Sequence, residues 1–178
     1  MIKTILIVLA LIVVAFVVVV ARQPAEFRIL RTTSIKAPPA IVFAQVNDLH
    51  KWQAWSPWAK LDPMAKNSFE GPGAGTGAIF GWVGNNQVGE GRMTITESQP
   101  DTRVCFKLDF LKPFKATHTA EFSFKPVGDQ TLVNWSMSGT NNFMFKAVRL
   151  FMNCDKMVGD QFEKGLVDLK AISESAGK

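Results

Sequence analysis

Residues 102–138 read TRVCFKLDFLKPFKATHTAEFSFKPVGDQTLVNWSMS, and their pattern predicts the central part of a sheet. Apolar and polar residues alternate through three segments, 102–110, 116–125 and 131–138, and a fourth such segment precedes them at 88–97. A period of two is typical of strands that place one face on a core. Short connections with turn residues, such as Pro100-Asp101 and Gly128-Asp129, predict an antiparallel meander.

The same alternation assigns every side chain of the meander to a face. The residues expected on the inner face are Met93, Ile95, Val104, Phe106, Leu108, Phe110, His118, Ala120, Phe122, Phe124, Val133, Trp135 and Met137. The other face carries mostly charged and hydroxyl side chains, together with Cys105, as expected of a solvated face. His118 is the one ionisable residue that the pattern places inward, where a hydrogen bond to a backbone carbonyl is the commoner arrangement and a contact with a ligand is the alternative.

The segments before the meander predict a further strand and a short helix. Residues 26–36 are rich in β-branched and apolar residues and are closed by Ala37-Pro38-Pro39, which indicates a strand. A helix beginning at Pro39 and ending near Asn47 follows from the apolar spacing at 42, 43, 46 and 49. Trp52, Trp55 and Trp58 come next, and we interpret these rings as capping the core, with contact between one of them and a ligand as the alternative.

After the meander, apolar residues recur with a period near 3.6 from Lys146 to Ser175. This spacing predicts one long amphipathic helix, with Cys154 on its apolar face as a core thiol. Gly159 and Gly165 lie inside the expected helix, where glycine weakens helix propensity, so we expect them to permit close packing or a bend.

Several classes of site are disfavoured by the composition. The glycine-rich stretch 71–86 lacks a GK[ST] ending and leads into a strand-like segment, so it is not typical of a nucleotide-binding loop. Two cysteines and two histidines offer no zinc spacing, and we expect no metal or cofactor. The net charge is +5, with basic residues scattered among acidic ones, which argues against nucleic-acid binding.

The N-terminal segment 1–22 is a separate unit. From Ile5 through Ala21 no residue is polar, and as a helix this run would be about 26 Å long, close to the thickness of a bilayer core. A signal peptide is the competing interpretation, although its apolar region is usually shorter, about 7 to 15 residues. We therefore expect a single membrane anchor. Positive charges flank it on both sides, so the side of the membrane stays open.

Motifs along the rest of the chain resemble a known family. These motifs are SIKAPPAIVFAQVNDL (34–49), WQAWSPW (52–58), VGEGRMTITESQP (88–100), LKPFKATHTAEFSF (111–124), WSMSG (135–139) and GDQFEKGLVDLK (159–170). Together they resemble the polyketide cyclase/dehydrase branch of the SRPBCC (START-like) superfamily. The resemblance implies an α+β helix-grip fold over residues 26–175, in which a curved antiparallel sheet wraps around a long C-terminal helix. The sheet and the helix are then expected to enclose a cavity for hydrophobic ligands.

Function varies widely across this fold, so the resemblance implies a pocket and not a reaction. We expect a carrier or binding module for an apolar small molecule or lipid, held in a single-pass position at a bacterial inner membrane. The residues expected to line the ligand site are Phe80, Phe106, His118, Phe122 and Trp135. Two alternatives stay open: a cyclase/dehydrase-type enzyme with His118 as acid-base, and a protein-interaction module whose partner is unknown.

Overall fold

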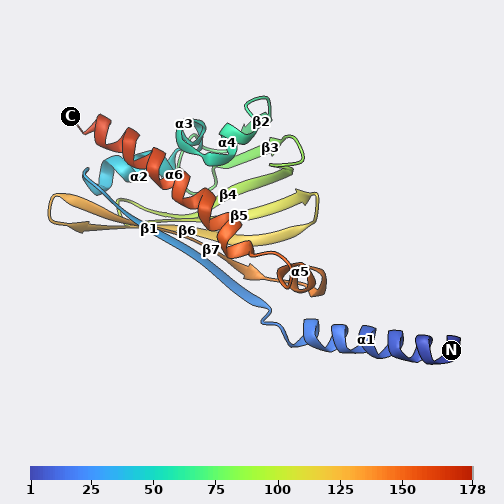
Figure 1. The fold of residues 1–178 in the computed structure, drawn as a ribbon. Coiled ribbons are helices and arrows are strands. Elements are labelled where there is room, and N and C mark those ends of the chain that lie inside the picture. Colours follow the sequence, from blue (N-terminus) through green and yellow to red (C-terminus); the bar gives the residue numbers. More distant parts are fainter. Residues whose placement is uncertain (178) are drawn as a thin grey trace.

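A seven-stranded antiparallel sheet forms the body of the molecule in a computed structural model that describes residues 1–177 (Figure 1). The strand order is β1-β7-β6-β5-β4-β3-β2. The strands are β1 (Glu26–Ile35), β2 (Lys66–Glu70), β3 (Ile79–Val83), β4 (Glu90–Gln99), β5 (Arg103–Lys112), β6 (Ala116–Val127) and β7 (Gln130–Thr140). The predicted meander is confirmed, because β4 to β7 pair in sequence order, and β1 returns to pair with β7.

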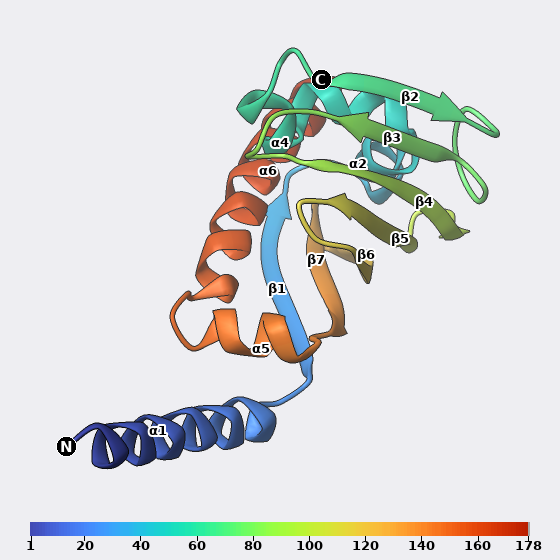
Figure 2. The same ribbon diagram turned by 90° about the vertical axis from the view of Figure 1, so that its right-hand side faces the viewer.

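The helices are α1 (Ile2–Arg22), α2 (Pro39–Asn47), the short 3₁₀ helix η1 (Leu49–Lys51), α3 (Trp52–Trp55), α4 (Pro57–Leu61), α5 (Phe143–Arg149) and α6 (Cys154–Ala176). Helices α2, α3, α4 and α6 cover the inner side of the curved sheet (Figures 1 and 2). The long helix α6 runs diagonally across the sheet, packs along β1 and contacts α2, α3 and α4 (Figures 1 and 2). This arrangement confirms the helix-grip architecture that the sequence predicts.

The core fills the end of the fold beneath α2, α3 and α4. Trp52 and Trp55 are buried there, as predicted, and each donates its indole N–H to a backbone carbonyl of α2. Trp135 on β7 stacks on Phe162 of α6, with ring centroids 4.0 Å apart. Gly165 makes this approach possible, because a β-carbon at that position would lie 2.8 Å from the Trp135 ring.

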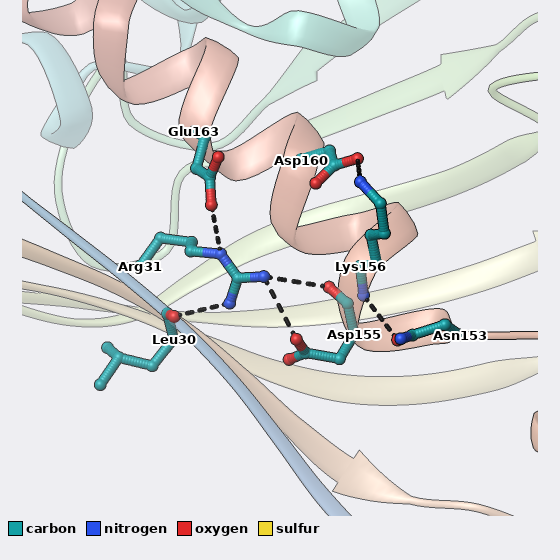
Figure 3. Close-up of polar contacts among 7 residues, drawn as sticks. All are labelled: Leu30, Arg31, Asn153, Asp155, Lys156, Asp160 and Glu163. Carbon is teal, nitrogen blue, oxygen red and sulfur yellow. Dashed lines mark hydrogen bonds and ion pairs between the residues drawn. The ribbon is translucent and has the colours of Figure 1, made fainter.

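The first half of α6 is fixed to β1 by Arg31 (Figure 3). Arg31 Nε donates to Glu163 Oε1 at 2.8 Å, and its Nη2 donates to the side chain and carbonyl of Asp155. Its Nη1 donates to the carbonyl of Leu30. Carboxylate contacts raise the Arg31 pKa above its ordinary value, the hydrogen bond with Asp155 being the largest cause. Since Asp155 is the second residue of α6, the helix begins opposite Arg31.

The prediction of one unbroken helix from Lys146 to Ser175 is wrong. The chain forms α5, leaves helical structure over 150–153, and begins α6 at Cys154. Each helix has an asparagine cap: the Asn142 side chain accepts from the N–H of Phe145, and the Asn153 side chain from that of Lys156. The thiol of Cys154 is half-buried at the start of α6 instead of lying in the core.

Helix α1 projects away from the sheet at the end that carries α5 (Figures 1 and 2). It is 21 residues long with a mean hydropathy of 3.4, which suffices to cross a membrane, although a signal sequence can have the same length and composition. The ring of Phe16 stacks on that of Phe151, between α5 and α6, at 6.5 Å between centroids. The N-terminal apolar helix therefore contacts the folded domain beside α5.

Candidate functional site

A row of half-buried rings crosses the inner face of the sheet at the end opposite the tryptophan cluster. We define this aromatic row by Phe27 (β1), His118 (β6), Phe110 (β5), Trp82 and Phe80 (both β3). Successive ring centroids lie 4.9, 5.5, 6.1 and 5.9 Å apart. Contacts at these distances are typical of attractive aromatic pairs, so the row is one continuous surface.

Two glycines allow the rings to approach one another across neighbouring strands. Gly139 of β7 lies between Phe27 and His118 in the strand register, and a β-carbon there would stand 2.6 Å from His118 Cδ2. Gly91 of β4 lies between Phe110 and Trp82, and a β-carbon there would stand 2.5 Å from Trp82 Cζ2. The absence of these two side chains leaves space that the flanking rings fill.

His118 supplies a polar atom to this otherwise apolar row. Its Nδ1 is buried and has no hydrogen-bond partner among residues 1–177. Burial lowers the pKa of the imidazole below its ordinary value, which favours the neutral form. A buried nitrogen without a partner is costly, so a ligand hydroxyl or carbonyl that bonded to it would be favoured.

The structure divides the five residues predicted to line the ligand site. Phe80 and His118 belong to the aromatic row, and both are half-buried. Phe106, Phe122 and Trp135 lie farther along the same inner face, where they are almost completely buried and pack against Trp52. These three rings form the packed core next to the row.

Three members of the row were not predicted as site residues: Phe27, Phe110 and Trp82. Alternation already placed Phe110 inward, but only the pairing of strands reveals that all three meet His118 or one another. The signal in the sequence was indirect, since glycine in a strand often marks a close approach, and both Gly91 and Gly139 occupy inner-face positions.

Two hollows on the surface differ in character from the row. One, of about 580 Å³, lies along β1, β7 and β6; its lining includes Phe27 and Gly139, but most of it is polar or charged, with side chains such as Arg28, Thr119 and Glu121. The other, of about 170 Å³, lies between His50 and the glycine-rich segment 71–73. We place the candidate site at the row because it combines apolar rings with a buried polar atom that has no partner in the part of the chain that the structure describes. Binding sites for small molecules typically have an apolar lining with a few polar groups.

The described residues also limit other chemistry. Within 1–177 no cluster of three or more His, Cys, Asp or Glu side chains is arranged to hold a metal ion. Cys105 and Cys154 are both free thiols. Cys105 lies on the outer face as predicted, where burial, as the largest cause, and the nearby Glu121 raise its pKa. A raised pKa disfavours the thiolate, so Cys105 is not set up as a nucleophile.

Comparison with known proteins identifies the family. The family model described as "Polyketide cyclase / dehydrase and lipid transport" matches residues 26–174. The chain belongs to this family. Its membership supports a domain that binds hydrophobic ligands. A comparison with curated proteins found no match.

Several solved structures share the fold of this chain. Protein CV1439 from Chromobacterium violaceum has a TM-score of 0.59 at 14% identity, over 85% of this chain and 99% of its own. The Aha1 dimer from Colwellia psychrerythraea has a TM-score of 0.59 at 17% identity, over 83% and 96%. CalU16 from Micromonospora echinospora has a TM-score of 0.56 at 18% identity, over 82% and 73%. At these identities the likeness shows the fold alone.

Proposed function

We propose that this protein binds an apolar small molecule or lipid against the aromatic row and holds it beside a membrane. The proposal rests on His118, whose buried Nδ1 has no hydrogen-bond partner within residues 1–177, while the rings of Phe27 and Phe110 lie beside it. Large apolar rings supply favourable contact area, and one polar group fixes the orientation of the ligand. The expected ligand is therefore largely apolar and carries a hydroxyl or carbonyl oxygen.

The neutral state of His118 suits this role. A neutral imidazole nitrogen either donates or accepts one hydrogen bond, depending on the tautomer. Its contacts in the row are with the rings of Phe27 and Phe110, and the neighbouring Asp109 belongs to the opposite face, where it accepts from Thr117. These surroundings favour binding over proton transfer, which would be assisted by a second polar group beside the imidazole.

The membrane tether is the second half of the proposal. Helix α1 has the length and composition of a bilayer span, and it joins the domain through only three residues, Gln23, Pro24 and Ala25, before β1. β1 begins one residue before Phe27, so the Phe27 end of the aromatic row lies near α1. An apolar ligand could therefore pass between the bilayer and the row over a short path.

Thermal unfolding of the delipidated full-length protein in detergent tests the proposal. A panel of fatty acids, phospholipids and isoprenoid quinones is added, and a ligand at about 100 times its Kd should raise the Tm by roughly 5–10 °C. The shift should fall sharply in His118→Phe, which keeps an aromatic ring but loses the nitrogen. A matched His50→Gln variant, at the exposed histidine outside the row, should keep it.

The same experiment separates binding from the enzyme alternative. The ligand that gives the largest shift is recovered and analysed by mass spectrometry after prolonged incubation. Recovery of the unchanged molecule supports a carrier. Recovery of a dehydrated or cyclised product that wild-type protein forms and His118→Phe does not would replace the carrier with an enzyme of the cyclase/dehydrase type.

A further inference from the structure

An exposed apolar surface surrounds α5 at the end of the domain that contacts α1. We define this α5 patch by Leu111, Phe114, Phe143, Met144, Phe151 and Met152, all of which are exposed. The largest exposed fractions are 79% for Phe151, 63% for Met144 and 58% for Phe114. Exposure of so many apolar side chains to water is unfavourable in free energy. Contiguous apolar patches on a surface usually mark an interaction site.

The patch is continuous although it comes from two distant parts of the sequence. Phe114 lies in the connection between β5 and β6, and its ring meets that of Phe145 on α5 edge to face, with centroids 5.9 Å apart. Figure 2 shows α5 and α1 at the same end of the molecule, away from β2 and β3. The connection 113–115 and the segment 143–152 therefore form one surface.

The position of the α5 patch along the axis of α1 indicates that lipid covers it. Phe151 stacks on Phe16, which precedes the last residue of α1, Arg22, by six positions. At 1.5 Å per residue, this places Phe16 about 9 Å inside the end of the helix. Interfacial helices bury their apolar faces roughly 5–10 Å into the boundary between headgroups and acyl chains. If Arg22 lies at the headgroups, the patch reaches the acyl chains.

The charged residues beside the α5 patch also favour a membrane as its partner. The basic residues Lys115, Lys146 and Arg149 lie in the two segments that carry the patch, and Arg22 ends the adjoining span. Apolar side chains accompanied by Lys and Arg are typical of segments that lie in the interface of an anionic membrane.

We propose that the α5 patch is a membrane-docking surface that inserts into the leaflet beside α1. The domain is thereby held upright on the bilayer, with the Phe27 end of the aromatic row facing the lipid. This inference rests on the membrane tether of the proposed function but not on the ligand.

Depth-dependent fluorescence quenching in the full-length protein tests this surface. In a Cys105→Ser, Cys154→Ser background, Phe151→Cys and Phe114→Cys each carry an environment-sensitive fluorophore, so that the two segments are tested separately. Val127→Cys is the control, because Val127 is equally apolar and exposed but lies at the opposite end of β6. The protein is reconstituted into vesicles of phosphatidylcholine and phosphatidylglycerol.

Docking predicts that nitroxides on the acyl chains quench the labels at 151 and 114 several-fold more strongly than the label at 127, while aqueous iodide shows the reverse order. Flotation of the vesicles reports on the tether separately. Protein that floats but shows iodide-accessible labels at 151 and 114 overturns the docking surface alone. Protein that does not float overturns both the tether and the docking surface, whereas ligand binding in detergent is unaffected by either result.

Discussion

The guanidinium of Arg31 lies directly against Gly159, in the space that a β-carbon on residue 159 would occupy. Arg31 cannot easily leave this position, because it bonds to Glu163 and Asp155 on either side of the glycine along α6. The exposed fraction of its side chain is only 22%. Gly159, although it weakens the helix, thus leaves the space that the Arg31 guanidinium occupies where it joins α6 to β1.

The Arg31–Gly159 contact predicts that Gly159→Ala has opposite effects on stability in the presence and in the absence of the Arg31 side chain. Gly159→Ala should destabilise the protein by about 1–3 kcal/mol, because the methyl group displaces the guanidinium from its partners. In an Arg31→Ala background the same substitution should stabilise it by up to about 1 kcal/mol, since alanine is the better helix former. Urea unfolding of the four proteins measures the cycle. Equal effects in both backgrounds would show that the contact is energetically unimportant.

The two asparagine caps predict unequal effects. Asn153→Ala should lower the free energy of global unfolding by about 1 kcal/mol, because Asn153 caps the long helix that packs on the core. Asn142→Ala removes the equivalent bond from α5, which has no buried residue, so its effect on global unfolding should be smaller. Chemical denaturation compares the two variants. A larger effect from Asn142→Ala would mean that α5 unfolds together with the core.

His118 predicts a specific pH dependence of stability. Its native pKa is lowered by burial, whereas the unfolded chain titrates near the ordinary value of about 6.5. Below that pH the imidazole is protonated in the unfolded chain but stays neutral in the native protein. The contribution of His118 to the free energy of unfolding is therefore fully present above about pH 6.5 and decreases as the pH falls toward the lower native pKa. His118→Phe and His118→Gln should lose less stability than wild type between pH 7.5 and 5.5 in urea titrations. Identical losses in all three proteins would exclude this effect of His118.

Two phenylalanines on the inner face separate ligand contact from core packing. Phe110→Ala removes a half-buried ring of the aromatic row, so it should reduce the ligand-induced Tm shift at a modest cost in stability. Phe124→Ala removes a ring that is 4% exposed, so it should cost about 3–5 kcal/mol while the ligand-induced shift persists. Thermal unfolding with and without ligand measures both quantities. A ligand shift that Phe110→Ala retains and Phe124→Ala loses would place the ligand elsewhere.

Much of the fold follows from alternation in the sequence. The four segments of the meander become β4 to β7 with boundaries shifted by at most two residues, and the residues predicted inward from Met93 to Phe106 and from Ala120 to Met137 are buried. Alternation is reliable here because one face of each strand meets the core and the other meets solvent. By contrast, β2 has no buried residue, so its sequence carries no such pattern.

The break between α5 and α6 was missed because apolar spacing continues through it. Leu150 and Phe151 fit a helix that faces the core, yet both are exposed beside α1. Periodicity reports that a side chain is apolar and does not distinguish a protein core from another apolar surrounding. The asparagines at 142 and 153 were the local signal for two helix starts.

The candidate site was predictable only in part. His118 was identified because it is the single ionisable residue on the inner face of the meander. The ring of Phe27 on β1 contacts His118, and the ring of Trp82 on β3 contacts Phe110. Only the register across Gly139 and Gly91 brings these strands, which are distant in sequence, into one row. A single sequence shows which face a side chain occupies but not which strands will lie beside it.

Native mass spectrometry of the full-length protein, extracted gently in detergent, tests the proposed binding of an apolar molecule most directly. After solvent extraction, the bound material is identified in wild type, in His118→Phe and in the His50→Gln control. We expect one class of apolar, oxygen-bearing molecule at near-stoichiometric occupancy in wild type and the control, and much less of it in His118→Phe. Protein that carries no such molecule, or carries it equally in all three proteins, would show that His118 does not hold an apolar ligand.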